Sequence, residues 1–180
     1  QKISNYIKCK TIDIGSLKNN FVKIGETKKK KTLLFISQFR NELTSNNNCF
    51  NIEKKLLPEI KLYCEKEKIN FYVLGAQKIN SDVEKKFFTK IIGSNNWKFL
   101  AARKNLDNYR EIDKFENIVF IDSTLGYEAI GRKKKVAIFS SRRLTKNSPY
   151  EKFAWPFKIK KRDFFYSNSC SKDEVKRVLD

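Results

Sequence analysis

Short apolar runs alternate with longer amphipathic stretches along most of the chain. Apolar runs of roughly four to eight residues are typical of buried strands, whereas apolar residues spaced three and four apart are typical of helices. From residue 31 the pattern predicts strands and helices in strict alternation, followed by a tail that ends in a helix. We expect strands at 32–39, 69–74, 97–101, 118–121 and 136–139, and helices at 52–66, 83–92, 105–114, 125–132 and 171–179.

This alternation predicts the α/β class, with a Rossmann-like parallel sheet and helices on both faces. Residues 31–165 are expected to form that domain, residues 1–30 a linker or the tail of a preceding domain, and residues 166–180 a C-terminal helix. The first strand is not followed by a G-x-G-x-x-G turn, and no P-loop pattern is present. A nicotinamide or flavin site is therefore disfavoured, and no cofactor is expected.

Two helices carry a local signal about where they begin. Pro58 interrupts the apolar spacing of 52–66, so that a kink or a late start is expected there. Ser171 precedes the last helix and Glu174 follows three residues later, which is the pattern of a capping box.

The most informative segment begins with the apolar run 118–121. Asp122, Ser123 and Thr124 follow it, and these residue types cap helix N-termini. Ligands of parallel sheets bind beyond the carboxyl ends of the strands, and a helix start with free N–H groups and two hydroxyls suits a phosphate. Glu128 lies one turn later on the face of Thr124 and can accept hydrogen bonds from a pair of sugar hydroxyls. The alternative is a plain N-cap, in which Glu128 only offsets the helix dipole.

The run IDSTLGYEAIGRKKKVAIFS, residues 121–140, resembles a motif of bacterial surface-carbohydrate glycosyltransferases, the O-antigen and capsule enzymes of GT-B architecture. The motif reads D-S-T-L-G-Y-E-A-[LI]-x-R-G-K-K-V. Weaker matches are ISQFR at 36–40, YVLG at 72–75 and FAWP at 153–156, so the resemblance spans residues 12–157. Lys133 stands where the motif has glycine, and we expect the backbone of that turn to differ.

The resemblance implies the carboxy-terminal, donor-binding half of a GT-B enzyme in O-antigen or capsule synthesis. The substrates would be a nucleotide sugar and a glycan or lipid-linked acceptor, and no catalytic base can be named. Without a D-x-D motif or histidine, the site is expected to be metal-independent and to stabilise the departing phosphate with hydroxyls and cations. The candidate donor-binding residues are Ser37, Gln38, Arg40, Ser123, Thr124 and Glu128, with Gly75, Tyr127 and Arg142 as weaker candidates.

Two other functions stay open at this point. One is a sugar-nucleotide epimerase with the same two-half architecture. The other is a non-catalytic module that binds an anionic ligand.

The chain carries 39 Lys and Arg against 20 Asp and Glu, a formal net charge of +19. Such an excess favours an anionic partner, but a global compositional bias toward lysine explains it as well. No nucleic-acid-binding signature is present, so nucleic acid is disfavoured and contact with an anionic membrane surface is the partner left open.

The chain has no histidine, and none of its four cysteines forms a C-x-x-C pair. A zinc site is therefore disfavoured, and catalysis by a histidine of this chain is excluded. Scattered cysteines fit reduced thiols, so we expect a cytoplasmic protein, with the inner face of the plasma membrane as the site of any membrane contact. The absence of methionine predicts that the sequence is a piece of a longer protein.

Overall fold

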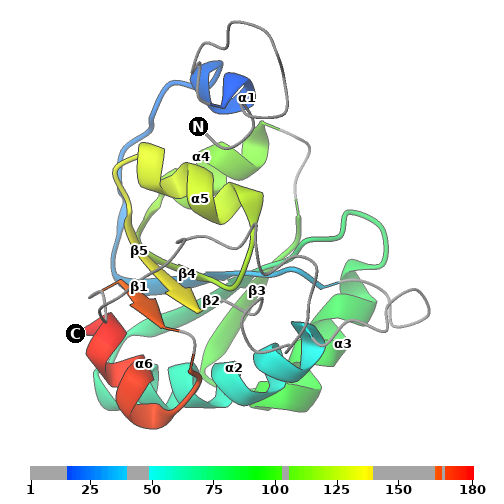
Figure 1. Ribbon diagram of the computed structural model, residues 1–180. Helices are drawn as coiled ribbons and strands as arrows, with labels where there is room; N and C mark the ends of the chain where they lie inside the picture. The colour runs from blue at the N-terminus through cyan, green and yellow to red at the C-terminus, as the bar shows by residue number, and fades with distance from the viewer. Residues whose placement is uncertain (1–15, 40–48, 103–105, 140–164, 168) are drawn as a thin grey trace, which may run out of the picture.

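The computed structural model describes residues 16–39, 49–102, 106–139, 165–167 and 169–180. Its centre is a six-stranded sheet in the order β3-β2-β1-β4-β5-β6, in which every neighbouring pair is parallel (Figure 1). This confirms the predicted α/β, Rossmann-like fold. The strands are β1 (Lys29–Ile36), β2 (Asn70–Leu74), β3 (Trp97–Leu100), β4 (Phe115–Phe120), β5 (Lys135–Phe139) and β6 (Tyr166–Ser167).

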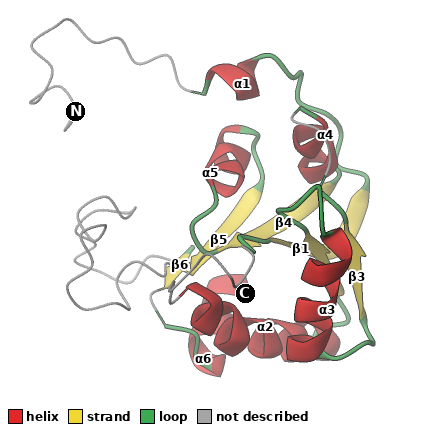
Figure 2. Cartoon of the chain, turned by 90° about the vertical axis from the view of Figure 1, so that its right-hand side faces the viewer, coloured by secondary structure: helices red, strands yellow, loops and turns green. Residues whose placement is uncertain are grey.

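Helices cover both faces of the sheet, as predicted. One face carries α2, α3 and α6, and the other carries α4 and α5 with the short α1 beyond them (Figure 2). The helices are α1 (Leu17–Asn20), α2 (Cys49–Lys66), α3 (Ser81–Ile92), α4 (Asp107–Asp113), α5 (Thr124–Gly131) and α6 (Lys172–Leu179).

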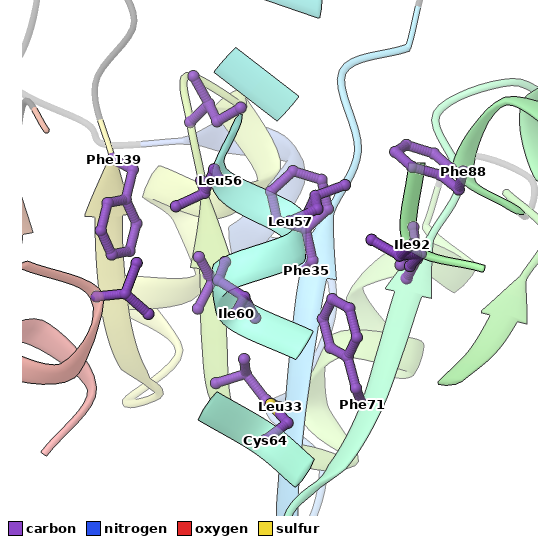
Figure 3. Close-up of a cluster of buried hydrophobic side chains, with 14 of the residues drawn as sticks. Leu33, Phe35, Leu56, Leu57, Ile60, Cys64, Phe71, Phe88, Ile92 and Phe139 are labelled. Carbon is purple, nitrogen blue, oxygen red and sulfur yellow. The ribbon is translucent and has the colours of Figure 1, made fainter. Parts of the chain in front are cut away.

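Each face of the sheet has its own core, because successive side chains of a strand point to opposite faces. Leu33 and Phe35 of β1 belong to the core beneath α2, α3 and α6. Leu34 and Ile36 belong to the core beneath α4 and α5. Figure 3 shows the first of these cores, where the apolar side of α2 lies against β1 and β2.

Several predicted boundaries are wrong by a few residues. β1 begins at Lys29 and ends at Ile36, so that Ser37 lies in the loop after the strand. α2 begins well before Pro58, because five of its apolar side chains are buried against the sheet and packing outweighs the hydrogen bond that proline cannot make. β6 was not predicted, since two residues are too few to show a pattern. α1 lies within the predicted linker.

Contacts link the predicted N-terminal linker to the domain. Arg132, at the end of α5, donates to the backbone carbonyls of Asn19, Val22 and Lys23, and Asp113 accepts from the backbone N–H of Gly25 at 2.8 Å. Residues 16–25 are therefore fastened to α4 and α5.

The turn after α5 keeps a glycine-like backbone. Lys133 has a φ of 61°, in the left-handed region that favours glycine. Its N–H donates to the carbonyl of Ile130 at 3.0 Å. Lys133 therefore adopts a backbone conformation that glycine takes without strain.

Candidate functional site

The strand order contains one change of direction, between β1 and β4. The helix after β1 covers one face of the sheet and the helix after β4 covers the other, so the two loops diverge at the carboxyl edge. β1 and β4 pair as far as Ile36 and Phe120, and the loops begin directly beyond them. Open α/β sheets bind ligands at this topological switch point. We call the loop residues on the two sides of this point, 37–38 and 122–124, the switch edge.

On the β4 side, no side chain of the described residues caps the start of α5. Ser123 is the N-cap residue with an extended backbone, yet its hydroxyl accepts no hydrogen bond from the first turn. Thr124 is exposed. The plain-cap interpretation of Ser123 predicts a side-chain bond to the helix, and that bond is missing. The helix start can therefore receive hydrogen-bond acceptors from a ligand.

Close packing fixes the position of this helix start. A Cβ atom at Gly126 would lie 2.2 Å from Cγ of Phe120, so only glycine lets α5 approach the end of β4 this closely. Tyr127 stacks edge-on against the same ring at 4.9 Å and donates a hydrogen bond of 3.2 Å to Asp122. Tyr127 thereby holds the loop that carries Ser123.

Glu128 is half-buried, and both of its oxygens are engaged. Oε2 accepts from the hydroxyl of Tyr109 at 2.7 Å, and Oε1 accepts from the hydroxyl of Ser16. Burial and this carboxylate raise the pKa of Tyr109 to about 12, so the phenol stays a donor. Glu128 thus ties α5 to α4 and to the start of α1, and a ligand hydroxyl would have to use its remaining lone pairs.

On the β1 side, Ser37 is buried and donates a hydrogen bond of 2.6 Å to Glu84 of α3. Glu84 also accepts from the backbone N–H groups of Ala76 and Gln77 at 2.9 and 3.0 Å. A Cβ atom at Gly75 would lie 2.9 Å from this carboxylate, which explains the glycine at the end of β2. Ser37 and Gly75 therefore organise the loops after β1 and β2, and Gln38 is the half-buried residue of the switch edge on this side.

Sequence reasoning missed Glu53, near the start of α2. Its side chain is 2% exposed, and Oε1 accepts from the backbone N–H of Gln38 at 3.4 Å. Oε2 is buried and has no hydrogen-bond partner among the described residues. Burial raises the pKa of Glu53 to about 8, and the nearby carboxylate of Glu84 contributes to the rise. Glu53, a buried carboxyl with one long hydrogen bond, therefore has the most strongly shifted pKa among the described acids beside the switch edge.

The structure thus brings Ser37 and Gln38 to the same edge as Ser123 and Thr124. The predicted candidates Arg40 and Arg142 lie outside the described residues. In the described ranges no three His, Cys, Asp or Glu side chains gather as ligands for a metal ion. None of the described helices is long and apolar enough to span a bilayer.

Comparison with known protein families gives a match over the whole chain. All of the chain, residues 1–180, matches the sequence model of a family described as "putative O-antigen biosynthesis protein". No curated protein matches the chain, and no solved structure matches it either.

Proposed function

The chain belongs to this family of O-antigen biosynthesis proteins, and we propose that it is a glycosyltransferase domain that binds a nucleotide-sugar donor at the switch edge. In this proposal the domain is the donor-binding half of a GT-B enzyme, and a second domain supplies the acceptor contacts. The transferred sugar joins a glycan or a lipid-linked acceptor.

The observation that carries the proposal is the uncapped start of α5 at the switch point of a Rossmann-like sheet. The hydroxyl of Ser123 and the first N–H groups of the helix lie together at the end of β4. A phosphate accepts from such groups and is also favoured by the positive end of the helix dipole. The diphosphate of a nucleotide sugar therefore fits this position.

The chemistry of sugar transfer needs a site of this kind. As the acceptor hydroxyl gives up its proton to a base and attacks the anomeric carbon, the bond to the phosphate oxygen breaks and its electron pair leaves with the nucleotide. Negative charge grows on that phosphate, and preorganised donors stabilise it in the transition state more than in the ground state. The start of α5 supplies fixed donors for that charge, and the proposal assigns no divalent metal.

A ligand panel tests the proposed function. The full chain is titrated with UDP-, GDP-, dTDP- and CMP-linked sugars and with the corresponding free nucleosides, each with and without EDTA. We expect at least one nucleotide sugar to bind, the matching nucleoside to bind far more weakly, and EDTA to change the affinity by less than about tenfold, or ~1.4 kcal/mol.

The same panel separates glycosyl transfer from the other functions. Binding followed by transfer to an added acceptor supports the transferase. Interconversion of one nucleotide sugar into its epimer without an acceptor points to the epimerase, and binding without any turnover points to a binding module or to a missing second half. A chain that binds no member of the panel contradicts the proposed function.

A further inference from the structure

Two carboxyl groups are buried side by side below the ends of β1 and β2, and they differ in their partners. Glu84 accepts three hydrogen bonds, from Ser37, Ala76 and Gln77. Glu53 accepts one, at 3.4 Å from Gln38, and within the described ranges its Oε2 has none. Burying a polar oxygen without a partner is unfavourable, and it is most unfavourable when the group is charged.

This difference decides which of the two carries the negative charge. Hydrogen bonds from a hydroxyl and two N–H groups favour the ionised form of Glu84, although burial raises its pKa. Glu53 lacks such donors, burial raises its pKa to about 8, and a charged Glu84 opposes a second charge nearby. Of the two carboxyl groups, Glu84 is therefore the better placed to hold a negative charge, and Glu53 the better placed to keep its proton.

Glu53 is also connected directly to the switch edge. Its one hydrogen bond comes from the N–H of Gln38, in the loop directly beyond the last β1–β4 pair. A proton on Glu53 keeps a second carboxylate charge, beside that of Glu84, away from this end of the site. Loss of that proton would place an anion in a buried, weakly screened position at the N–H of Gln38, on the β1 side of the switch edge.

Resting on the function proposed above, we propose that Glu53 is a specificity-determining residue that admits a phosphate-bearing ligand only while it carries its proton. Glu53 acts through the loop after β1 and through its charge, and it does not touch the reacting atoms. The ligand class that it selects is an anionic diphosphate ester, and ionised Glu53 rejects this class.

Among the described residues, few other groups near Glu53 titrate in the relevant range. Glu84 faces it from α3. Cys170 precedes α6, which packs on α2, and burial raises the pKa of its thiol. Since the chain has no histidine, Glu53 is the candidate for a transition near pH 8 at this edge.

The test measures binding of two probes, UDP-glucose and inorganic sulfate, at about pH 6.5 and about pH 9. The full chain is compared with Glu53→Gln, which imitates the neutral acid at every pH. Glu59→Gln, on the same helix, is the matched control, because its carboxyl is only half-buried. Any change in the ionisation of the probes themselves alters the affinities of all three proteins equally.

We expect the parent chain and Glu59→Gln to bind about tenfold more weakly at the higher pH, because only about one tenth of the molecules then carry the proton on Glu53. Glu53→Gln should lose less than about twofold. Equal affinity of the parent chain at both pH values overturns the proposal, and so does a parallel loss in Glu53→Gln. Sulfate binding with this pH dependence, without any binding of UDP-glucose or another nucleotide sugar, would support the role of Glu53 and contradict the proposed function.

Infrared spectra of the parent chain provide a measurement that needs no variant. A protonated buried carboxyl has a carbonyl stretch separate from that of carboxylates. We expect this band at about pH 6.5 and its loss by about pH 9. A parent chain without the band at the lower pH overturns the proposal even if Glu53→Gln fails to fold.

Discussion

The guanidinium of Arg132 lies against the carboxylate of Asp113, with Nε 2.7 Å from Oδ1, and both side chains are almost fully buried. The same guanidinium lies 5.3 Å from the ring centre of Tyr109 and donates to backbone carbonyls of residues 19–23. The Arg132–Asp113 ion pair therefore holds α4, α5 and residues 16–25 together.

Asp113→Ala should lower the free energy of unfolding by about 3–5 kcal/mol, because it leaves a buried guanidinium without its counter-charge. The control is Glu116→Ala, which breaks the exposed 2.8 Å pair with Lys135 and should cost less than about 1 kcal/mol. Urea denaturation of both variants measures the difference. Equal, small losses of unfolding free energy in the two variants would show that the Arg132–Asp113 pair does not stabilise the packing of α4 and α5.

Two glycines of α5 provide a test of how closely the helix packs. Gly126→Ala places a methyl group against the ring of Phe120 and should destabilise the fold by about 1–3 kcal/mol, despite the better helix propensity of alanine. At Gly131 the nearest atom, Nδ2 of Asn19, would be 3.5 Å from the added Cβ. Gly131→Ala should therefore be neutral or stabilising by up to ~1 kcal/mol. Thermal unfolding that ranks the two variants in the opposite order would contradict the packing described for α5.

The β4–α5 unit could be predicted from the sequence, because its signals are local. An apolar strand, three residues that favour N-caps and a glycine in the first turn stand next to one another at 118–126. The strand order could not be predicted, but the parallel alternation was enough to place Ser37 and Ser123 at one edge.

Glu53 could not be found in this way. In the sequence it precedes Lys54 and Lys55 and looks like an ordinary charged residue of an amphipathic helix. Its environment depends on how the start of α2 meets the loop after β1 and the start of α3, which are contacts between segments distant in the sequence. For the same reason the partners of Glu128 were missed, since Ser16 lies 112 residues away.

The buried carboxyl of Glu53 should make the stability of the fold depend on pH. The folded state keeps a proton that the unfolded chain loses near pH 4.5, so unfolding releases a proton between about pH 4.5 and about pH 8. The contribution of Glu53 to the free energy of unfolding is fully present below pH 4.5. It falls as pH rises through that window, by up to about 1.4 kcal/mol per pH unit. Burial of Glu84 acts in the same direction.

Glu53→Gln should remove most of this slope, while Glu59→Gln keeps it. Urea denaturation of the three proteins at constant ionic strength, between about pH 4.5 and about pH 8, measures how the free energy of unfolding depends on pH. Unfolding free energies that rise from pH 5 to pH 8 in the parent chain, or a slope unchanged in Glu53→Gln, would show that Glu53 is ionised in the folded protein.

The carboxylate of Glu128 is expected to stabilise the fold through Tyr109. Glu128→Gln removes the charge of the acceptor in the 2.7 Å hydrogen bond and Tyr109→Phe removes its donor, and each should cost about 1–3 kcal/mol. The double variant should cost less than the sum of the two single variants, because the two side chains share this interaction. Additive losses would mean that they act independently.

Glu128 remains a candidate for binding the sugar hydroxyls of the donor, and the same variants test this role. If it is a ligand group, Glu128→Gln weakens donor binding by about 1.5–3 kcal/mol, whereas Tyr109→Phe leaves binding nearly unchanged. Equal binding by both variants and the parent chain would limit Glu128 to its structural role.

The most direct test of the account compares two N-cap serines in the affinity for the best-binding nucleotide sugar. Ser123 caps α5 without a side-chain hydrogen bond, whereas Ser171 caps α6 and accepts from Glu174 at 3.4 Å. Ser123→Ala should weaken donor binding by about 1.5 kcal/mol, or roughly tenfold, with little change in melting temperature. Ser171→Ala should bind the donor like the parent chain and lose about 1 kcal/mol of stability. Unchanged donor binding in Ser123→Ala, with only its melting temperature lowered, would contradict a phosphate site at the switch edge.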